Sequence, residues 1–188
     1  MKELIEKIER FVPINEQEEA DKKIILHFLK TQNDIFLRSS LSAHMTASAW
    51  VVNRQRTKVL MAYHNIYNSW AWLGGHADGE ADLLSVALRE AKEESGIRNV
   101  SPVTEDIFSL EVIAVEGHEK KGEYVPSHLH LNVTYLLEAD ESESLKIRED
   151  ENSAVGWLTF DEVIEKSSEP WFYTRIYPKL ITRSSSSF

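Results

Sequence analysis

Cysteine is absent from the 188 residues, which excludes disulfides, thiolate nucleophiles and sulfur-ligated zinc. Any metal must therefore be bound by oxygen or imidazole ligands. Long hydrophobic runs are also lacking: no apolar stretch is long enough to cross a bilayer, and the first residues do not have the pattern of a secretion signal. The sequence predicts a soluble, cytoplasmic protein with no membrane partner.

Basic residues are in the minority. The formal net charge is −10, and no basic stripe interrupts the acidic background. A broadly negative protein repels a polyanion, so a nucleic acid polymer is not an expected partner. If the substrate is itself anionic, a divalent cation must mediate between it and the protein.

The first 40 residues are predicted to be a helical extension. Apolar residues recur at helical spacing over 2–11 until Pro13 interrupts the pattern, and Asn15 with Glu18 resembles a capping box ahead of a second helix over 16–31. These helices are expected to be packing elements, with a lid or a dimer contact as alternatives. At the other end, residues 184–188 are expected to be a tail without function.

Residues 41–183 are predicted to form one domain, because strand-like and helix-like patterns alternate along it. A glycine at position 96 is expected to end the most regular helix. The predicted strands are 45–52, 58–63, 107–115, 128–137 and 155–158, and the predicted helices are 80–95, 160–166 and 171–182. Interleaving of this kind predicts a mixed α/β class.

Three glutamates, Glu90, Glu93 and Glu94, are related by helical steps of three and four residues, so they are expected to project from one face of the helix over 80–95. The opposite side carries apolar residues that are expected to face the core: Leu84, Ala87, Leu88 and Ala91. Such carboxylates suit magnesium, which prefers a few carboxylates together with phosphate oxygens and water. The alternative is a solvated helix with charge pairs, but the glycine-rich turn over 74–79 directly upstream favours a ligand site.

The segment from Gly75 to Ile97 resembles the Nudix box, GX5EX7REUXEEXGU, where U is aliphatic. Arg89 and Glu90 match the RE pair, and Glu93 and Glu94 match the EE pair. Two positions depart from the pattern, since Ala81 stands where the first glutamate is expected and the aliphatic position is the small Ala91. Glu80, directly before Ala81, is a candidate substitute.

The resemblance implies an α/β/α sandwich with a mixed sheet and hydrolysis of a nucleoside diphosphate linked to another group. It implies a divalent metal, magnesium with manganese as the alternative, held by Glu90, Glu93, Glu94 and the Gly75 carbonyl. Arg89 would orient the glutamates. The base that deprotonates the attacking water stays open between Glu90 and an acidic residue of a later loop, Glu149 or Glu151. The resemblance also leaves a homodimer open.

Residues outside the helix are expected to bind substrate. His128 and His130 lie two apart on a predicted strand and so share a face, and His76 lies within the glycine turn. Trp72, just before the turn, can stack on a base. Each has a structural alternative: the histidines as hydrogen-bonded packing residues, His76 as a helix cap, and Trp72 in the core.

Two other functions compete with hydrolysis. A regulatory module that binds a nucleotide without cleaving it is suggested by Ala81, although the intact Glu90, Glu93 and Glu94 weigh against it. An isomerase of allylic diphosphates on the same fold would need a cysteine, which this chain lacks. For a hydrolase, nucleoside triphosphates, nucleotide sugars and dinucleotides are all candidate small-molecule substrates.

Overall fold

The computed structural model describes residues 1–120 and 122–186. A mixed sheet runs in the order β10-β2-β1-β9-β5, with β3 beside β2, β4 beside β1 and β6 beside β9. Its strands are β1 (Ala43–Asn53), β2 (Lys58–His64), β3 (Ser69–Ala71), β4 (Leu73–His76), β5 (Val100–Pro102), β6 (Ser109–Val115), β9 (His128–Ala139) and β10 (Asn152–Thr159). The central pair, β1 and β9, is parallel, whereas β2 and β4 run antiparallel to β1.

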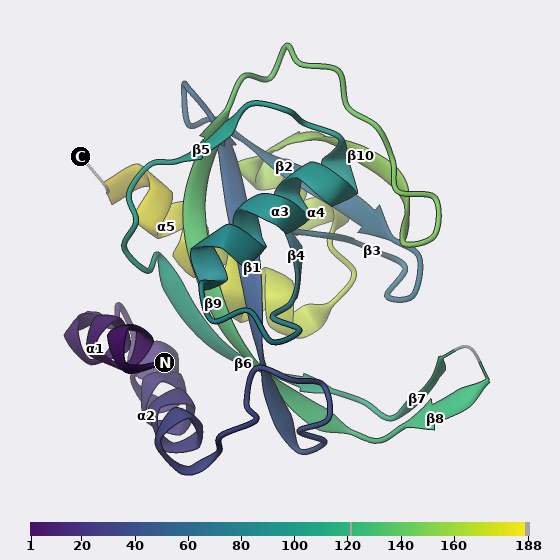
Figure 1. The fold of residues 1–188 in the computed structure, drawn as a ribbon. Helices are drawn as coiled ribbons and strands as arrows, with labels where there is room; N and C mark the ends of the chain where they lie inside the picture. The colour runs from purple at the N-terminus through teal and green to yellow at the C-terminus, as the bar shows by residue number, and fades with distance from the viewer. Residues whose placement is uncertain (121, 187–188) are drawn as a thin grey trace.

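Helices cover both faces of this sheet (Figure 1). On one face lies α3 (Leu83–Ser95), and on the other lie α4 (Phe160–Lys166) and α5 (Tyr177–Ser186), the latter preceded by a π-helical turn, η1 (Phe172–Ile176). This confirms the mixed α/β class and the α/β/α layering. The helix expected over 171–182 is divided between η1 and α5.

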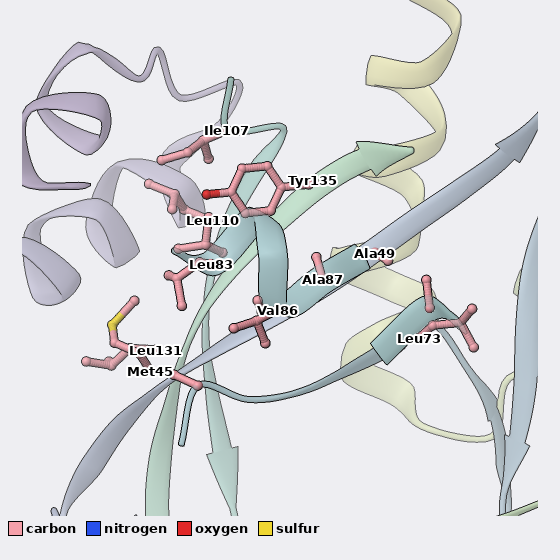
Figure 2. Packing of buried hydrophobic residues seen from close by; sticks show 14 of the residues in the cluster. Met45, Ala49, Leu73, Leu83, Val86, Ala87, Ile107, Leu110, Leu131 and Tyr135 are labelled. Atoms are coloured by element: carbon pink, nitrogen blue, oxygen red, sulfur yellow. The ribbon is translucent and has the colours of Figure 1, made fainter. Parts of the chain in front are cut away.

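Two apolar cores follow from the alternation of side chains along the strands. The core beneath α3 contains residues such as Met45 and Tyr135, and Figure 2 shows Leu83, Val86 and Ala87 of α3 among them. The core on the opposite face joins the far end of β1 to α4 and α5 through Trp50, Val52, Met61, Val163, Tyr177 and Leu180. The rigid sandwich therefore fixes α3 against β1 and β4.

The N-terminal helices form as expected, as α1 (Lys2–Arg10) and α2 (Glu16–Thr31). Asn15 caps α2 by accepting a hydrogen bond from the Glu18 backbone N–H at 3.0 Å. The helices pack beside β6 through Ile8, Ile25 and Leu29, which are buried in the first core. They are packing elements in this structure, whereas the proposed boundary after residue 40 stays a prediction.

Some elements differ from those expected. A small hairpin, β7 (His118–Lys120) and β8 (Glu123–Val125), projects from the sheet and was not predicted (Figure 1). The tail expected from residue 184 is corrected in part, because α5 continues to Ser186 and the buried Ser184 hydroxyl accepts a hydrogen bond from Trp50 Nε1 at 2.9 Å. Residues 187 and 188 lie outside the described residues. Among the described helices, none is long and apolar enough to cross a membrane.

Candidate active site

Helix α3 is set in place by signals at both ends. Asp82 caps its start by accepting a hydrogen bond from the Ser85 backbone N–H, and Gly96 ends it in the left-handed region at φ 71°. Its buried residues include Val86, Ala87 and Ala91, but also Glu94. Glu90 and Glu94 therefore border the face that packs against β4, which corrects the expectation that the carboxylates project from the side opposite the core.

The glycine turn meets these two carboxylates directly. The Gly74 backbone N–H donates a hydrogen bond to Glu94 Oε2 at 3.0 Å. A Cβ atom placed on Gly75 would lie 2.5 Å from Cδ of Glu90, so only glycine leaves room for the carboxylate. The glycine pair thus allows the backbone of β4 to approach the carboxylates of α3 more closely than a side chain would permit.

Burial makes the ionised form of the Glu90 and Glu94 carboxylates unfavourable. It raises the pKa of Glu94 to about 8, and the nearby carboxylates of Glu90 and Glu151 act in the same direction. Burial likewise raises the pKa of Glu90, against the effect of Arg89, which donates to Glu90 Oε1 at 3.1 Å. A metal cation at this position would offset the remaining repulsion between the carboxylates.

The third glutamate is differently placed. Glu93 has a half-exposed side chain that forms ion pairs with Arg89 at 4.0 Å and with Arg148 at 3.3 Å. Arg148 also pairs with Glu151 at 3.2 Å, which holds the loop before β10 against α3. Sequence reasoning missed Arg148, because its role depends on a contact between residues 55 positions apart. Its basic side chain among acidic neighbours, Glu149 and Asp150, was the available signal.

Glu80 does not take the place of the glutamate that Ala81 replaces. Ala81 is exposed, and the Glu80 carboxylate accepts a hydrogen bond from the Asp82 backbone N–H at 2.8 Å within the loop that precedes α3. Glu80 thus supports the start of the helix in this structure. The site is built by Glu90 and Glu94, with Glu93 and Glu151 at its rim.

Four histidines gather on the other face of the sheet. His76 follows Gly75 in β4 and so points away from α3, toward His130 of β9 at a ring-centroid distance of 4.8 Å. His128 and His130 are neighbours as predicted, and His44 of β1 joins them. Burial lowers the pKa of His130 to about 2, which keeps its ring neutral. Substrate binding by His76, His128 and His130 stays a prediction.

Trp72 takes part in an aromatic group. Its ring forms T-shaped contacts with the rings of Phe172 and Tyr177 at centroid distances of 5.8 and 6.1 Å, and it is partly buried against the second core. This is the packing role that was the alternative to stacking on a base. Contact of Trp72 with a substrate stays a prediction.

Comparison with known proteins agrees with this geometry. The family model described as NUDIX domain matches residues 43–180. Among solved structures, a C. elegans Ap4A hydrolase binary complex is similar at a TM-score of 0.53 and 18% identity, covering 76% of this chain and 96% of that one. The E. coli dihydroneopterin triphosphate pyrophosphohydrolase is similar at a TM-score of 0.55 and 14% identity, covering 73% and 94%.

A NUDIX-family hydrolase from Clostridium perfringens is also similar, at a TM-score of 0.53 and 19% identity, covering 73% of this chain and 95% of that one. At these identities the structural likeness establishes the fold. A search of curated protein sequences found no match. The family model spans most of the chain and includes the glycine turn, α3 and the loop before β10, so the chain belongs to the Nudix family and is a pyrophosphohydrolase of the Nudix type.

Proposed function

We propose that this protein is a magnesium-dependent enzyme that hydrolyses the diphosphate linkage of a nucleoside diphosphate joined to another group. The observation that carries the proposal is the meeting of Glu90 and Glu94 with the Gly74–Gly75 backbone. Two buried carboxylates lie beside a backbone turn, and in the described part of the chain Glu94 forms no ion pair. Such a site suits a hard cation.

The residues present fit a magnesium ion. Glu90, Glu94 and the Gly75 carbonyl would supply oxygen ligands, and Glu93 would act as a further ligand directly or through water. Manganese is the alternative ion, since it takes the same ligands. When bound, the ion would neutralise charge on the phosphate oxygens and polarise phosphorus for attack.

The chain's own residues would then position and deprotonate the water. Arg89 orients Glu90 and Glu93 through its ion pairs with them. Glu151, held beside α3 by Arg148, is our preferred base, with Glu93 and Glu90 as alternatives. The base accepts one proton from water, the water oxygen forms a new bond to phosphorus, and the bridging P–O bond breaks with its electron pair leaving on the departing phosphate.

A depression beside Glu93 is lined by Gly96, Lys146, Ile147, Arg148 and Glu149. We propose that a small nucleotide substrate approaches the carboxylates across this surface. Nucleoside triphosphates, nucleotide sugars and dinucleotides all carry the diphosphate that the proposed chemistry requires. Cytoplasmic location, a homodimer and the exclusion of nucleic acid polymers stay predictions.

Ala81 motivates a second candidate, a module that binds a nucleotide without cleaving it. The neighbouring carboxylate, that of Glu80, accepts a hydrogen bond from the Asp82 backbone N–H instead of taking the place of the missing glutamate. The two candidates share the binding site and differ in turnover. Reverting the position with Ala81→Glu should raise kcat if the missing carboxylate limits the rate.

The test is release of phosphate or diphosphate from a panel of nucleoside triphosphates, ADP-ribose, nucleotide sugars and dinucleoside polyphosphates, with and without magnesium. The panel is repeated with Glu94→Gln and with Glu105→Gln, a matched change on an exposed loop. We expect turnover that requires both magnesium and Glu94 and is unchanged in Glu105→Gln. Nucleotide binding without turnover, in the original protein and in Ala81→Glu, would favour the non-catalytic module.

A further inference from the structure

Four imidazole rings, those of His44, His76, His128 and His130, are packed together. His44 of β1 lies opposite His130 in the parallel register of β1 and β9, and His128 and His76 lie on the same face. The ring centroids of His44 lie 5.1 Å from His76, 4.8 Å from His128 and 5.1 Å from His130. Three separate strands thus bring their histidines to one point.

The hydrogen bonds at this cluster direct ring nitrogens inward. His44 Nδ1 lies 3.2 Å from the Ser40 carbonyl oxygen, and His128 Nδ1 lies 2.8 Å from that of Pro126. A carbonyl oxygen only accepts, so Nδ1 carries the proton in both rings and Nε2 of a neutral ring carries a lone pair. Histidines that bind metals are commonly oriented by such a bond.

Among the residues that the structure describes, the inward nitrogen of His44 has no hydrogen-bond partner. Its Nε2 is fully buried, and an unpaired buried polar atom is unfavourable unless a ligand satisfies it. Nε2 of His128 and Nε2 of His130 face each other at 3.1 Å. In a tetrahedral zinc site with Zn–N bonds of 2.0–2.1 Å, adjacent nitrogens are about 3.3 Å apart.

The spacing of the cluster is close to that of a metal site. One ligand nitrogen each from His44, His76 and His130 lies within 4.8 Å of the others. Small rotations about the side-chain bonds would bring the three to ligand spacing. The charged groups Arg38 and Asp78 both act electrostatically on His44, and their bidentate pair at 2.6 Å leaves little net charge to repel a cation.

We propose that His44, His76 and His130 form a binding site for one divalent transition-metal ion of the zinc class, with His128 beside it as a fourth ligand. Imidazole suits zinc, copper and nickel, whereas magnesium prefers oxygen. The site is separate from the carboxylate site, because consecutive residues Gly75 and His76 face opposite sides of β4. An ion here would join β1, β4 and β9 next to the glycine turn.

The test uses the full chain, stripped with a chelator and then dialysed against zinc in the presence of excess magnesium, which occupies oxygen sites. We expect one zinc ion per chain, a rise in the melting temperature of about 5 °C at saturation, and, with cobalt in place of zinc, visible absorption bands of tetrahedral coordination. The cobalt spectrum needs no variant, so it tests the site even if a histidine variant fails to fold.

Variants distinguish this site from others. His44→Ala and His130→Ala should each weaken zinc binding roughly 100-fold, whereas His27→Ala, on an exposed face of α2, and Glu94→Gln should bind zinc as the original protein does. Absence of zinc and of the cobalt bands in the original protein would overturn the proposal. So would zinc binding that is lost in Glu94→Gln and kept in His44→Ala. Neither result depends on hydrolase activity.

Discussion

The Lys179 ammonium on α5 lies 2.9 Å from a carboxylate oxygen of Glu111 on β6, and both side chains are almost fully buried. The same ammonium lies 3.4 Å from Glu18 of α2, which Arg183 also contacts at 2.7 Å. The Ser109 hydroxyl lies within hydrogen-bond distance of a carboxylate oxygen of each glutamate and donates its one hydrogen to one of them. This buried network joins the N-terminal helix, the sheet and the C-terminal helix.

Lys179→Met should destabilise the protein by about 3–5 kcal/mol, because two buried carboxylates would lose their shared cation. The free energy of unfolding from urea titration measures the loss. Lys166→Met is the matched control, since the Lys166–Glu162 pair at 2.8 Å is on the surface and should contribute little. If Lys179→Met unfolds at the same urea concentration as the control, the network does not stabilise the fold.

The adjacent glycines should respond differently to alanine. A Cβ on Gly75 would meet the Glu90 carboxyl, a flexible side chain that can swing aside, so Gly75→Ala should reduce kcat roughly 100-fold with little loss of stability. A Cβ on Gly74 would lie 2.7 Å from the backbone oxygen of Ala47, which cannot move as freely, so Gly74→Ala should cost about 1–3 kcal/mol of stability.

Steady-state kinetics and urea titration of both variants separate these effects. The two substitutions are chemically the same and one residue apart, so each is the control for the other. A Gly75→Ala protein with unchanged kcat would show that the contact with Glu90 is not needed for catalysis.

The metal-free protein should lose stability as the pH rises. Burial raises the pKa of Glu94 to about 8 in the folded state, whereas an unfolded glutamate titrates near its model value of 4.5. Between these values the folded state binds more protons, so the free energy of unfolding falls with increasing pH. This contribution is fully present below pH 4.5 and is lost as the pH rises toward 8.

Glu94→Gln tests this effect. Glutamine can still accept the Gly74 hydrogen bond, so the variant should match the original near pH 5 and be more stable near pH 8, by on the order of a few kcal/mol. Saturating magnesium should reverse the order at pH 8, since it stabilises the ionised carboxylate. Melting curves at the two pH values, with chelator or magnesium, give the answer. Equal stability of the two proteins at pH 8 under chelator would contradict it.

Local patterns predicted the glycine turn and the helix that follows it. The box from Gly75 to Ile97 places its glycine turn, helix and glutamates within 23 residues, so spacing alone brings Glu90 and Glu94 together. Alternating strand residues similarly predicted that His128 and His130 share a face. These patterns did not predict that the Glu94 side chain is buried whereas that of Glu93 is exposed.

Contacts between residues that lie far apart in the sequence were not predicted. Lys179 reaches Glu18 and Glu111 only after α2 has packed beside β6 and α5 has packed on the sheet, and each of these residues alone has the character of a surface charge. His44 joins His130 only through the parallel register of β1 and β9. Such pairings depend on strand order, which the sequence pattern left undetermined.

The preferred base can be distinguished from its neighbours by kinetics. Glu151 and Glu149 lie in the same loop, but Glu151 is held against α3 by Arg148, whereas Glu149 is exposed. Glu151→Gln should lower kcat by about 10²–10⁴-fold and remove the acid limb of the pH profile, while the magnesium concentration for half-maximal rate changes little. Glu149→Gln should leave both unchanged. If Glu93→Gln loses the acid limb and Glu151→Gln keeps it, the base is on α3, and the role of Arg148 would be to orient Glu93.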